Sequence, residues 1–477
     1  MRCARCKKEV MGEDIKICPY CKSKLGFWQD VPIMIESLEI KKLFNRIDYK
    51  IDFKNDDNVS IFIAPNGCGK TTIFKFLNFI LNPTWDNYID IVSIPVENFA
   101  CKLSNGVSLI YQRNSKKPEE NHERNMNYSY IVKKGGKSEK INFYEEYKTI
   151  NFSNYLSSVN REDFEENGKF NKEMFSEFLN EKVDKLFDNH KKIILKMSML
   201  NRKHNVAPCI SFINANRINQ ISLKDRNVKI DPKVKDAEQY MTTIDKCVED
   251  SKTLVQQCNN EYTTYLDNAR EELAVDYVNS SEFKLPYEKF MEEWNKYCNE
   301  IESYKQMGFL NTKNKVFDLK ISKEDYENSK GGFLTLYLNK FSRTLAPFRE
   351  LFHKVKLFTE IINDRNKFTG KSISFSNEHG IEMKVGGEFL DMNNLSSGEK
   401  NDFLMFYNLI LGSTQNGIIF IDEPEISLHI EWQETFIDKI LEISKINNQQ
   451  VIIATHSPNI INGHFELFAK KEADYGI

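Results

Sequence analysis

The sequence lacks any apolar run close to the about 18 residues that a membrane-spanning helix requires. An apolar stretch typical of a signal peptide is also missing behind the first residues, Met1–Cys6. Net charge is small, because 66 Lys and Arg residues nearly balance 69 Asp and Glu residues and leave −3. These absences disfavour a membrane protein, a secreted protein and a polycation that coats nucleic acid, so we expect a cytoplasmic protein. A local basic run, Lys191, Lys192 and Lys196, is interpreted as a solvated helix face.

Cysteines are scattered without a pairing pattern, except near the N-terminus, where four of the ten fall within the first 21 residues. These four form two Cys-x-x-Cys pairs, and a turn signal at 11–14 separates them. Four thiolates so placed can surround Zn²⁺ and replace the core that so small a unit cannot build. We predict a structural zinc ribbon over residues 1–30, against the alternatives of a redox pair or free thiols. Its ligands would be Cys3, Cys6, Cys18 and Cys21.

The segment Ala64–Thr71 matches the phosphate-binding pattern G-x-x-x-x-G-K-[ST], with Ala64 in place of the first glycine. It follows an apolar strand expected at 59–63 and precedes a helical pattern at 73–81. Backbone N–H groups at Gly67 and Gly69 can close around phosphates, Lys70 supplies a positive charge, and the Thr71 hydroxyl can reach Mg²⁺. The residues expected to bind ATP are Asn66, Gly67, Cys68, Gly69, Lys70, Thr71 and Thr72.

Two carboxylates follow a second apolar strand, expected at 418–421. Asp422 is expected to hold Mg²⁺, and Glu423 is the candidate general base that polarises the attacking water. Acidic residues also end strands for purely structural reasons, which is the alternative. His456 follows the next expected strand, at 451–454, and is interpreted as a phosphate sensor, although a lone histidine is more often structural.

A second anion cradle is expected where Leu395–Lys400 combines serine and glycine at a helix N-terminus. A nucleotide already held by Lys70 does not need this cradle, so we expect it to contact the ATP of another subunit. Its candidate residues are Ser396, Ser397, Gly398 and Glu399.

The overall pattern alternates strands and helices and is interrupted by helical periodicity between about 237 and 364. A self-packed helical subdomain is preferred there over an extended coiled coil. The predicted fold is α/β, a P-loop NTPase head in two lobes with a helical insertion. The predicted domains are the zinc ribbon at 1–30, an N-terminal lobe at 31–217, the insertion at 218–365 and a C-terminal lobe at 366–477.

Together these motifs resemble the ABC ATPase superfamily, specifically the soluble, SMC/OLD-like heads related to chromosome-organising, DNA-repair and phage-defence ATPases. The matching positions are Walker A at 64–71, the signature at 395–400, Walker B at 418–423, the D-loop at 427–429 and the switch histidine, His456. The resemblance implies a homodimer that sandwiches two ATP molecules and hydrolyses them. It also places Asn216 where a glutamine normally senses Mg²⁺ and the attacking water.

A narrower resemblance is to the PtuA family, the ATPases of the Septu anti-phage systems that also accompany some retrons. It is carried by the segments 212–217, 361–364, 371–373 and 423–433. It implies a higher homo-oligomer that senses infection and controls a separate HNH nuclease of the PtuB kind. Two alternatives stay open: a DNA repair or maintenance ATPase whose ribbon touches nucleic acid, and a module that binds ATP without hydrolysing it.

Overall fold

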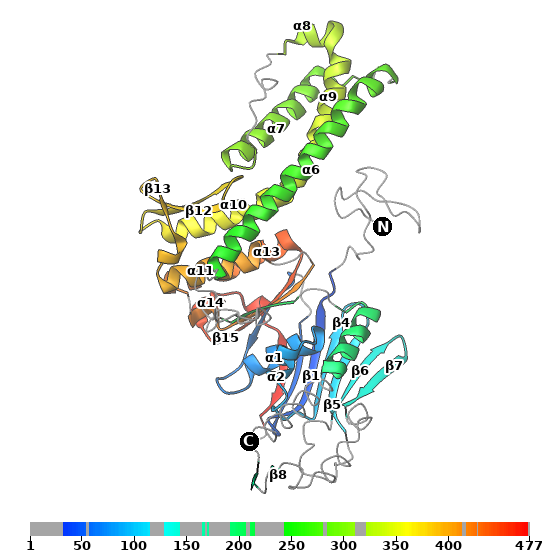
Figure 1. Ribbon diagram of the computed structural model, residues 1–477, viewed down its shortest axis with the longest axis vertical. Helices are drawn as coiled ribbons and strands as arrows, with labels where there is room; N and C mark the ends of the chain where they lie inside the picture. Colours follow the sequence, from blue (N-terminus) through cyan, green and yellow to red (C-terminus); the bar gives the residue numbers. More distant parts are fainter. Residues whose placement is uncertain are drawn as a thin grey trace. The chain divides into compact units, whose positions relative to one another are not determined.

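The computed structural model describes residues 32–53, 57–114, 128–143, 165–166, 169–170, 191–206, 210–214, 243–279, 284–310, 321–412, 416–426 and 428–475. These residues fall into two compact units. The sheet unit consists of the described parts of 31–216 and 413–477, and the helical unit consists of the described parts of 217–412. Figure 1 labels many of the elements of both units.

A seven-stranded antiparallel sheet forms one layer of the sheet unit, with strand order β16-β2-β1-β4-β5-β6-β7. Alternate residues along its strands are buried, as expected for a sheet with one face on a core. The strands are β1 (Ile35–Leu43), β2 (Ile47–Asp52), β4 (Asn98–Leu103), β5 (Ser108–Arg113), β6 (Tyr128–Lys134), β7 (Lys137–Asn142) and β16 (Lys470–Asp474). A separate two-stranded ribbon pairs β8 (Glu165–Glu166) with β9 (Lys169–Phe170).

A four-stranded parallel sheet forms the second layer, in the order β10-β14-β15-β3. Its strands are β3 (Val59–Ile63), β10 (Ile210–Asn214), β14 (Ile418–Asp422) and β15 (Gln450–Thr455). Nearly continuous apolar runs such as Ile418–Ile421 suit strands that are buried on both faces. Segments from the two ends of the sequence therefore complete one sheet.

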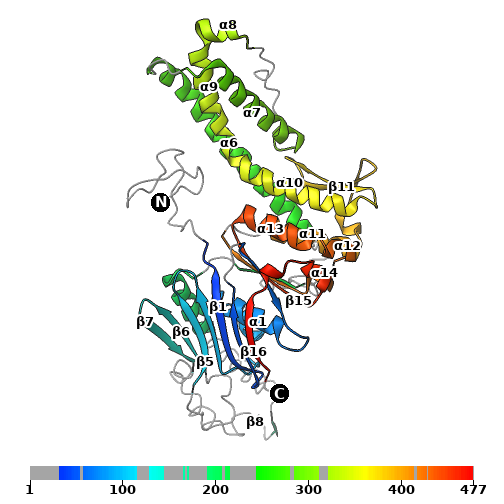
Figure 2. The ribbon, with the colours of Figure 1, turned by 180° about the vertical axis from the view of Figure 1, so that it is seen from behind.

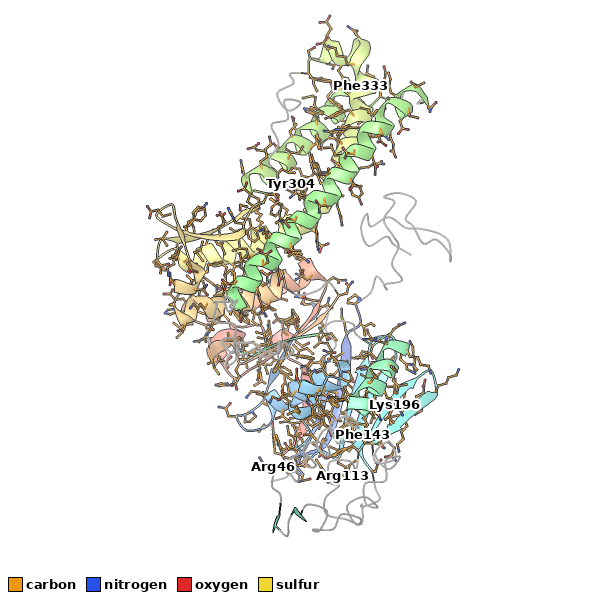
Figure 3. All side chains as sticks on the ribbon, in the orientation of Figure 1. Arg46, Arg113, Phe143, Lys196, Tyr304 and Phe333 are labelled. Atoms are coloured by element: carbon orange, nitrogen blue, oxygen red, sulfur yellow. The ribbon has the colours of Figure 1, made fainter. Side chains whose placement is uncertain are left out.

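Helix α1 (Lys70–Leu81) packs against strands of both sheets, namely β5, β10 and β14. Its buried aromatic face meets the antiparallel sheet, where Phe76 stacks on Phe99 with ring centroids 5.0 Å apart. Phe143, labelled in Figure 3, is completely buried in the same core.

The other helical elements of this unit are α2 (Trp85–Ile89), a helix at 191–203, α12 (Ile430–Gln433), α13 (Phe436–Asn447), α14 (Pro458–Ile461) and the 3₁₀ turns Pro424–Ile426 and Phe465–Leu467.

The helical unit is built on α6 (Thr243–Asn279), which packs along α9 (Gly331–Thr344) and α10 (Ala346–Asn366). Helix α7 (Tyr287–Gln306) packs on α9, and α8 (Lys323–Asp325) leads through a π-helical turn, Tyr326–Lys330, into α9. Aromatic side chains fill this interior: Tyr304, labelled in Figure 3, packs its ring against Phe309, Phe348 and Phe352.

A three-stranded antiparallel sheet packs on these helices, with β11 (Lys371–Ser376), β12 (Gly380–Val385) and β13 (Glu388–Leu390). Strand β12 contacts α6 and β11 contacts α10. A 3₁₀ turn, Met392–Asn394, then leads into α11 (Ser397–Ile410), which packs on α10. Residues 371–412 thus group with the helical unit, whereas the sequence placed them in a C-terminal lobe from 366 onward.

The mixed α/β class expected from the sequence is confirmed. The last part of the helical periodicity noted between about 237 and 364 forms two helices, because Pro347 lies in the first turn of α10 and cannot continue α9. Helix α6 continues through the buried Ser251, whose hydroxyl donates to the carbonyl of Val248. Among the described helices, none combines the length and apolar character that crossing a bilayer requires.

Candidate functional site

The carboxyl ends of the parallel strands gather the candidate residues of the sheet unit. Asp422 is the register partner of both Asn214 and Ala454, and Thr455 is the partner of Ile63. Each of the four strands therefore ends at the same edge. In open α/β sheets, ligands bind in the crevice outside this edge.

The phosphate-loop candidate connects β3 to α1 at this edge. Gly67 and Gly69 have φ values of +77° and +86°, which side chains other than glycine rarely adopt. A Cβ added at Gly69 would lie 3.0 Å from the side chains of Leu43 and Phe44, so glycine is required there for space as well. Asn66 and Gly67 are exposed, while Cys68, Thr71 and Thr72 are partly buried. The first N–H groups of α1 have no partner within the helix and can receive an anion.

Lys70 is folded back onto the loop and is 5% exposed. Its Nζ donates to the carbonyl of Ala64 at 3.0 Å and to Oδ1 of Asn66 at 3.3 Å. It also lies 3.5 Å from Oε1 of Glu423. A buried ammonium held by three oxygens is already positioned beside the loop, so a phosphate oxygen can replace one of them.

Thr71 and Asp422 contact each other although they lie in distant parts of the sequence. The Thr71 hydroxyl donates to Oδ2 of Asp422 at 2.6 Å, while Oδ1 is buried and has no hydrogen-bond partner among the described residues. Burial raises the pKa of Asp422, and the hydrogen bond from Thr71 only partly opposes this. A hydroxyl next to a carboxylate with an unused oxygen is a donor set that fits Mg²⁺.

Glu423 follows Asp422 with φ at +49°, an uncommon conformation for a residue other than glycine. Its N–H is held by the carbonyl of Ala454 at 2.8 Å. Its carboxylate is 24% exposed, and Oε1 lies 3.9 Å from Nδ1 of His456. The turn therefore directs a partly solvated carboxylate along the edge where the loop and the histidine also lie.

Glu425 is a site residue that sequence reasoning missed. Its carboxylate is 9% exposed and accepts hydrogen bonds from the Thr455 hydroxyl at 2.8 Å and the His456 backbone N–H at 3.2 Å. The imidazole Nδ1 of His456 lies 3.1 Å from the same carboxylate. The sequence did show that Glu425 lies close to Asp422 and Glu423. Only the pairing of β14 with β15, however, brings Glu425 next to His456.

The signature candidate begins α11 in the helical unit. Ser396 and Glu399 form a capping box, in which the Ser396 hydroxyl accepts from the Glu399 N–H and the Glu399 carboxylate accepts from the Ser396 N–H. Burial alone would raise the pKa of Glu399, but hydrogen bonds from Lys371 and Ser396 lower it overall. Ser397 and Gly398 are exposed, and an added Cβ at Gly398 meets no atom within 4 Å. The cap uses the Ser396 hydroxyl internally, whereas the Ser397 hydroxyl has no hydrogen bond to any residue that the structure describes.

Several predicted positions lie outside the described residues. They are Asn216, Ser427 of the D-loop, and the four cysteines predicted to bind zinc, Cys3, Cys6, Cys18 and Cys21. Within the described ranges, no group of three or more histidine, cysteine, aspartate or glutamate residues is arranged to hold a metal ion. These assignments stay predictions.

A family model for an ATPase domain matches most of the sequence. Residues 34–461 match the family model described as AAA ATPase domain. Among solved structures, the chain is similar to the Smc head domain with an extended coiled coil bound to the C-terminal domain of ScpA, from Pyrococcus furiosus. The sequence identity is 13% and the TM-score is 0.36, and the match covers 92% of this chain and 96% of that one. It is also similar to the SmcHead bound to the C-winged helix domain of ScpA, at 12% identity and a TM-score of 0.35, covering 92% and 97%. No curated protein matches the sequence. Because the family model spans most of the sequence, the chain belongs to the AAA ATPase domain family.

Proposed function

We propose that the chain is an ABC-type ATPase, which binds ATP at the carboxyl edge of the parallel sheet and hydrolyses it there. The observation that carries this proposal is the junction at that edge. Lys70 lies 3.5 Å from Glu423, Thr71 bonds to Asp422, and Glu423 lies 3.9 Å from His456. These side chains belong to three separate chain segments, and they meet at the place where a phosphate chain would lie.

Each residue has a distinct part in this proposal. Lys70 and the N–H groups at the start of α1 bind the phosphates of ATP. Thr71 and Asp422 hold Mg²⁺, which, when bound, neutralises charge that develops on the phosphate oxygens. Glu423 accepts a proton from the attacking water, and it lies 3.5 Å from the buried ammonium of Lys70. His456 contacts the phosphate that leaves.

A second copy of the chain completes the site in this proposal. The N-terminus of α11, with the exposed residues Ser397 and Gly398, has N–H groups that can bind an anion. The dimer would therefore place the α11 end of each subunit on the ATP of the other. Asn216 would contact Mg²⁺ and the attacking water.

We further propose that this ATPase regulates a separate HNH nuclease in anti-phage defence, and that its N-terminal cysteines bind Zn²⁺. The support is the sequence resemblance to PtuA, including the segment at 423–433 that contains Glu425 and Gln433. Co-expression with an HNH subunit of the PtuB kind should give a stable complex and protect cells from phage. A protein that instead forms no such complex and preserves genome integrity after DNA damage would be a DNA maintenance ATPase.

The ATPase proposal is tested by measuring ATP binding and phosphate release for the purified chain with Mg²⁺. Replacing Lys70 by alanine should abolish binding at concentrations that saturate the wild type. Lys75→Ala is the matched control, because this lysine lies on the same helix and pairs with Asp90 at 3.7 Å, away from the loop. Wild-type protein that neither binds nor hydrolyses ATP would refute the proposal.

A further inference from the structure

A phosphate loop must solve a backbone problem before it can bind an anion. To point its N–H groups inward, it has to turn several carbonyl groups the other way, toward the protein. Carbonyls that face protein need donors, because a buried polar group without a partner costs free energy. The donors available to the loop at 64–69 therefore bear on how well it is held.

Tyr49 on β2 supplies one of these donors. Its hydroxyl donates to the carbonyl of Cys68 at 2.8 Å, in the last turn of the loop before α1. The ring is 2% exposed and packs edge-on against Phe62 and Tyr475, with centroids 6.0 and 6.1 Å away. Burial raises the pKa of Tyr49, so the hydroxyl keeps its proton and remains a donor.

Lys471 on β16 supplies a donor at the other end of the loop. Its Nζ donates to the carbonyl of Ile63, the last residue of β3, and lies 5.8 Å from the ring centroid of Phe62. Strand β16 is fixed there by its pairing with β2, in which Lys471 is opposite Ile51. The N–H of Ala469 also donates to the carbonyl of Ile61 at 3.0 Å, which joins this segment to β3. Figure 2 shows β16, in red, along the edge of the antiparallel sheet.

The turn between β1 and β2 adds a third support from the same sheet. The side chains of Leu43 and Phe44 approach Gly69 so closely that an added Cβ would lie 3.0 Å from each. The loop is therefore held at its start by Lys471, near its end by Tyr49, and at Gly69 by this turn. All of these residues come from the antiparallel sheet, and none belongs to the edge where the nucleotide is proposed to bind.

We propose that Tyr49 and Lys471 are positioning residues for the phosphate loop: they bind its outward carbonyls and so keep its N–H groups directed at the phosphates of ATP. The inference rests on the proposed function for its ligand. Because neither residue reaches Glu423 or the attacking water, their loss weakens nucleotide binding more than it slows the chemical step.

The first test compares Tyr49→Phe with Tyr130→Phe. Tyr130 is the comparison because its buried hydroxyl contacts the carbonyl of Ile80 at 3.0 Å, at the opposite end of α1, and also Oδ1 of Asn201 at 2.5 Å. Each variant removes a tyrosine hydroxyl that contacts a backbone carbonyl at one end of the same helix. We expect Tyr49→Phe to raise the Kd and KM for ATP about five- to tenfold with kcat within about twofold, since one net hydrogen bond is worth about that factor. Tyr130→Phe should lower Tm without changing Kd.

The second test replaces the lysine. Lys471→Met should weaken ATP binding in the same direction as Tyr49→Phe, whereas Lys470→Met, on the exposed neighbouring position, should not. Unchanged ATP affinity in both Tyr49→Phe and Lys471→Met overturns the proposal. Equal weakening in Tyr130→Phe overturns it as well, because the effect would then be general destabilisation of α1.

Hydrogen exchange separates this inference from the proposed function. In nucleotide-free protein, Tyr49→Phe should speed exchange of the amides in residues 64–72 at least about threefold relative to wild type, while Tyr130→Phe should leave them unchanged. This readout needs no ATP. If wild-type protein binds no nucleotide but Tyr49→Phe still speeds exchange in residues 64–72, the proposed function is wrong and the positioning role of Tyr49 remains supported. If exchange is unchanged in Tyr49→Phe, the positioning role is wrong, whether or not the protein binds ATP.

Discussion

Thr71 and Asp422 are 351 positions apart in the sequence, yet the threonine hydroxyl donates to one carboxylate oxygen of the aspartate at 2.6 Å. The other oxygen, Oδ1, is buried and has no partner among the described residues. Burial of this half-satisfied carboxylate raises the pKa of Asp422. Burying this carboxylate therefore costs folding free energy, which is typical of a site that binds a cation.

Asp422→Asn should raise the Tm of the nucleotide-free protein, because it removes a poorly solvated charge and keeps an oxygen for the Thr71 hydroxyl. The same change should abolish Mg²⁺-dependent ATP hydrolysis. Calorimetry without nucleotide and a phosphate-release assay measure the two effects. Asp438→Asn, at an exposed carboxylate that pairs with His464, should give no gain in Tm. A lower Tm for Asp422→Asn would contradict the view that this charge is uncompensated.

Glu425 should affect catalysis through His456. We expect Glu425→Ala to lower kcat by about tenfold to a hundredfold, by analogy with the loss of a hydrogen-bond partner that orients a metal-binding histidine. The double variant with His456→Ala should be no slower than His456→Ala alone, because both changes remove one function. Steady-state kinetics of the three proteins measure this coupling.

Gln433→Leu is the control for that cycle. Gln433 links the same two turns, since its amide donates to the backbone carbonyls of Glu425 and Leu428 and accepts from the Ser457 hydroxyl. Among the described residues it makes no hydrogen bond to the imidazole of His456. The coupling energy between Gln433→Leu and His456→Ala should be smaller than the coupling energy between Glu425→Ala and His456→Ala. If the two energies were equal, packing of the turns would set the position of His456, and the Glu425 carboxylate would not.

Gly398→Asp should bind ATP yet fail to hydrolyse it. The exposed backbone has room for the side chain, so the fold should tolerate the change. A carboxylate about 4 Å from a phosphate of the other subunit would be repelled by about 4 kcal/mol at an effective dielectric of about 20. Gly332→Asp is the matched control, at another helical glycine with open space. Full activity of Gly398→Asp would mean that each chain hydrolyses ATP alone.

Mixing Gly398→Asp with Lys70→Ala sharpens this test of the composite site. A mixed dimer has one site in which an intact phosphate loop meets an intact α11 end, while its other site carries both lesions. We therefore expect partial ATPase activity to return on mixing, provided that subunits exchange, which a size shift between tagged subunits can verify.

Purified protein should contain about one zinc ion per chain, and replacing both Cys3 and Cys6 by serine should remove it. Elemental analysis of protein prepared without chelators measures the content. ATP turnover should survive the substitution, because the five ATPase motifs begin beyond residue 30. Zinc-free wild-type protein would exclude the ribbon.

Local patterns predicted the strands that carry the site. The apolar run at 59–63 coincides with β3, and the runs at 418–421 and 451–454 fall within β14 and β15, because buried parallel strands read as continuous apolar segments. Strands β4, β7 and β16 were not predicted. Much of β7 and β16 is polar and exposed, so neither has the alternation that marks a strand.

Contacts across the fold were beyond the sequence. Glu425 reaches His456 only because β14 and β15 are neighbours, and Tyr49 reaches the carbonyl of Cys68 only because β2 lies beneath the phosphate loop. Both depend on register between strands, which a motif does not encode. The sequence therefore indicated the candidate site residues, and the fold identified which other residues contact them.

The most direct test of the account is ATP hydrolysis by Glu423→Gln. Glutamine keeps the size of the side chain but cannot accept a proton, so the variant should bind ATP as the wild type does. Its rate of ATP hydrolysis should be lower by about a hundredfold or more. Glu431→Gln, at an exposed glutamate on α12, should leave turnover unchanged. Single-turnover phosphate release with both proteins saturated by ATP is the measurement. Wild-type turnover in Glu423→Gln would contradict the assignment of the general base and, with it, the proposed active site.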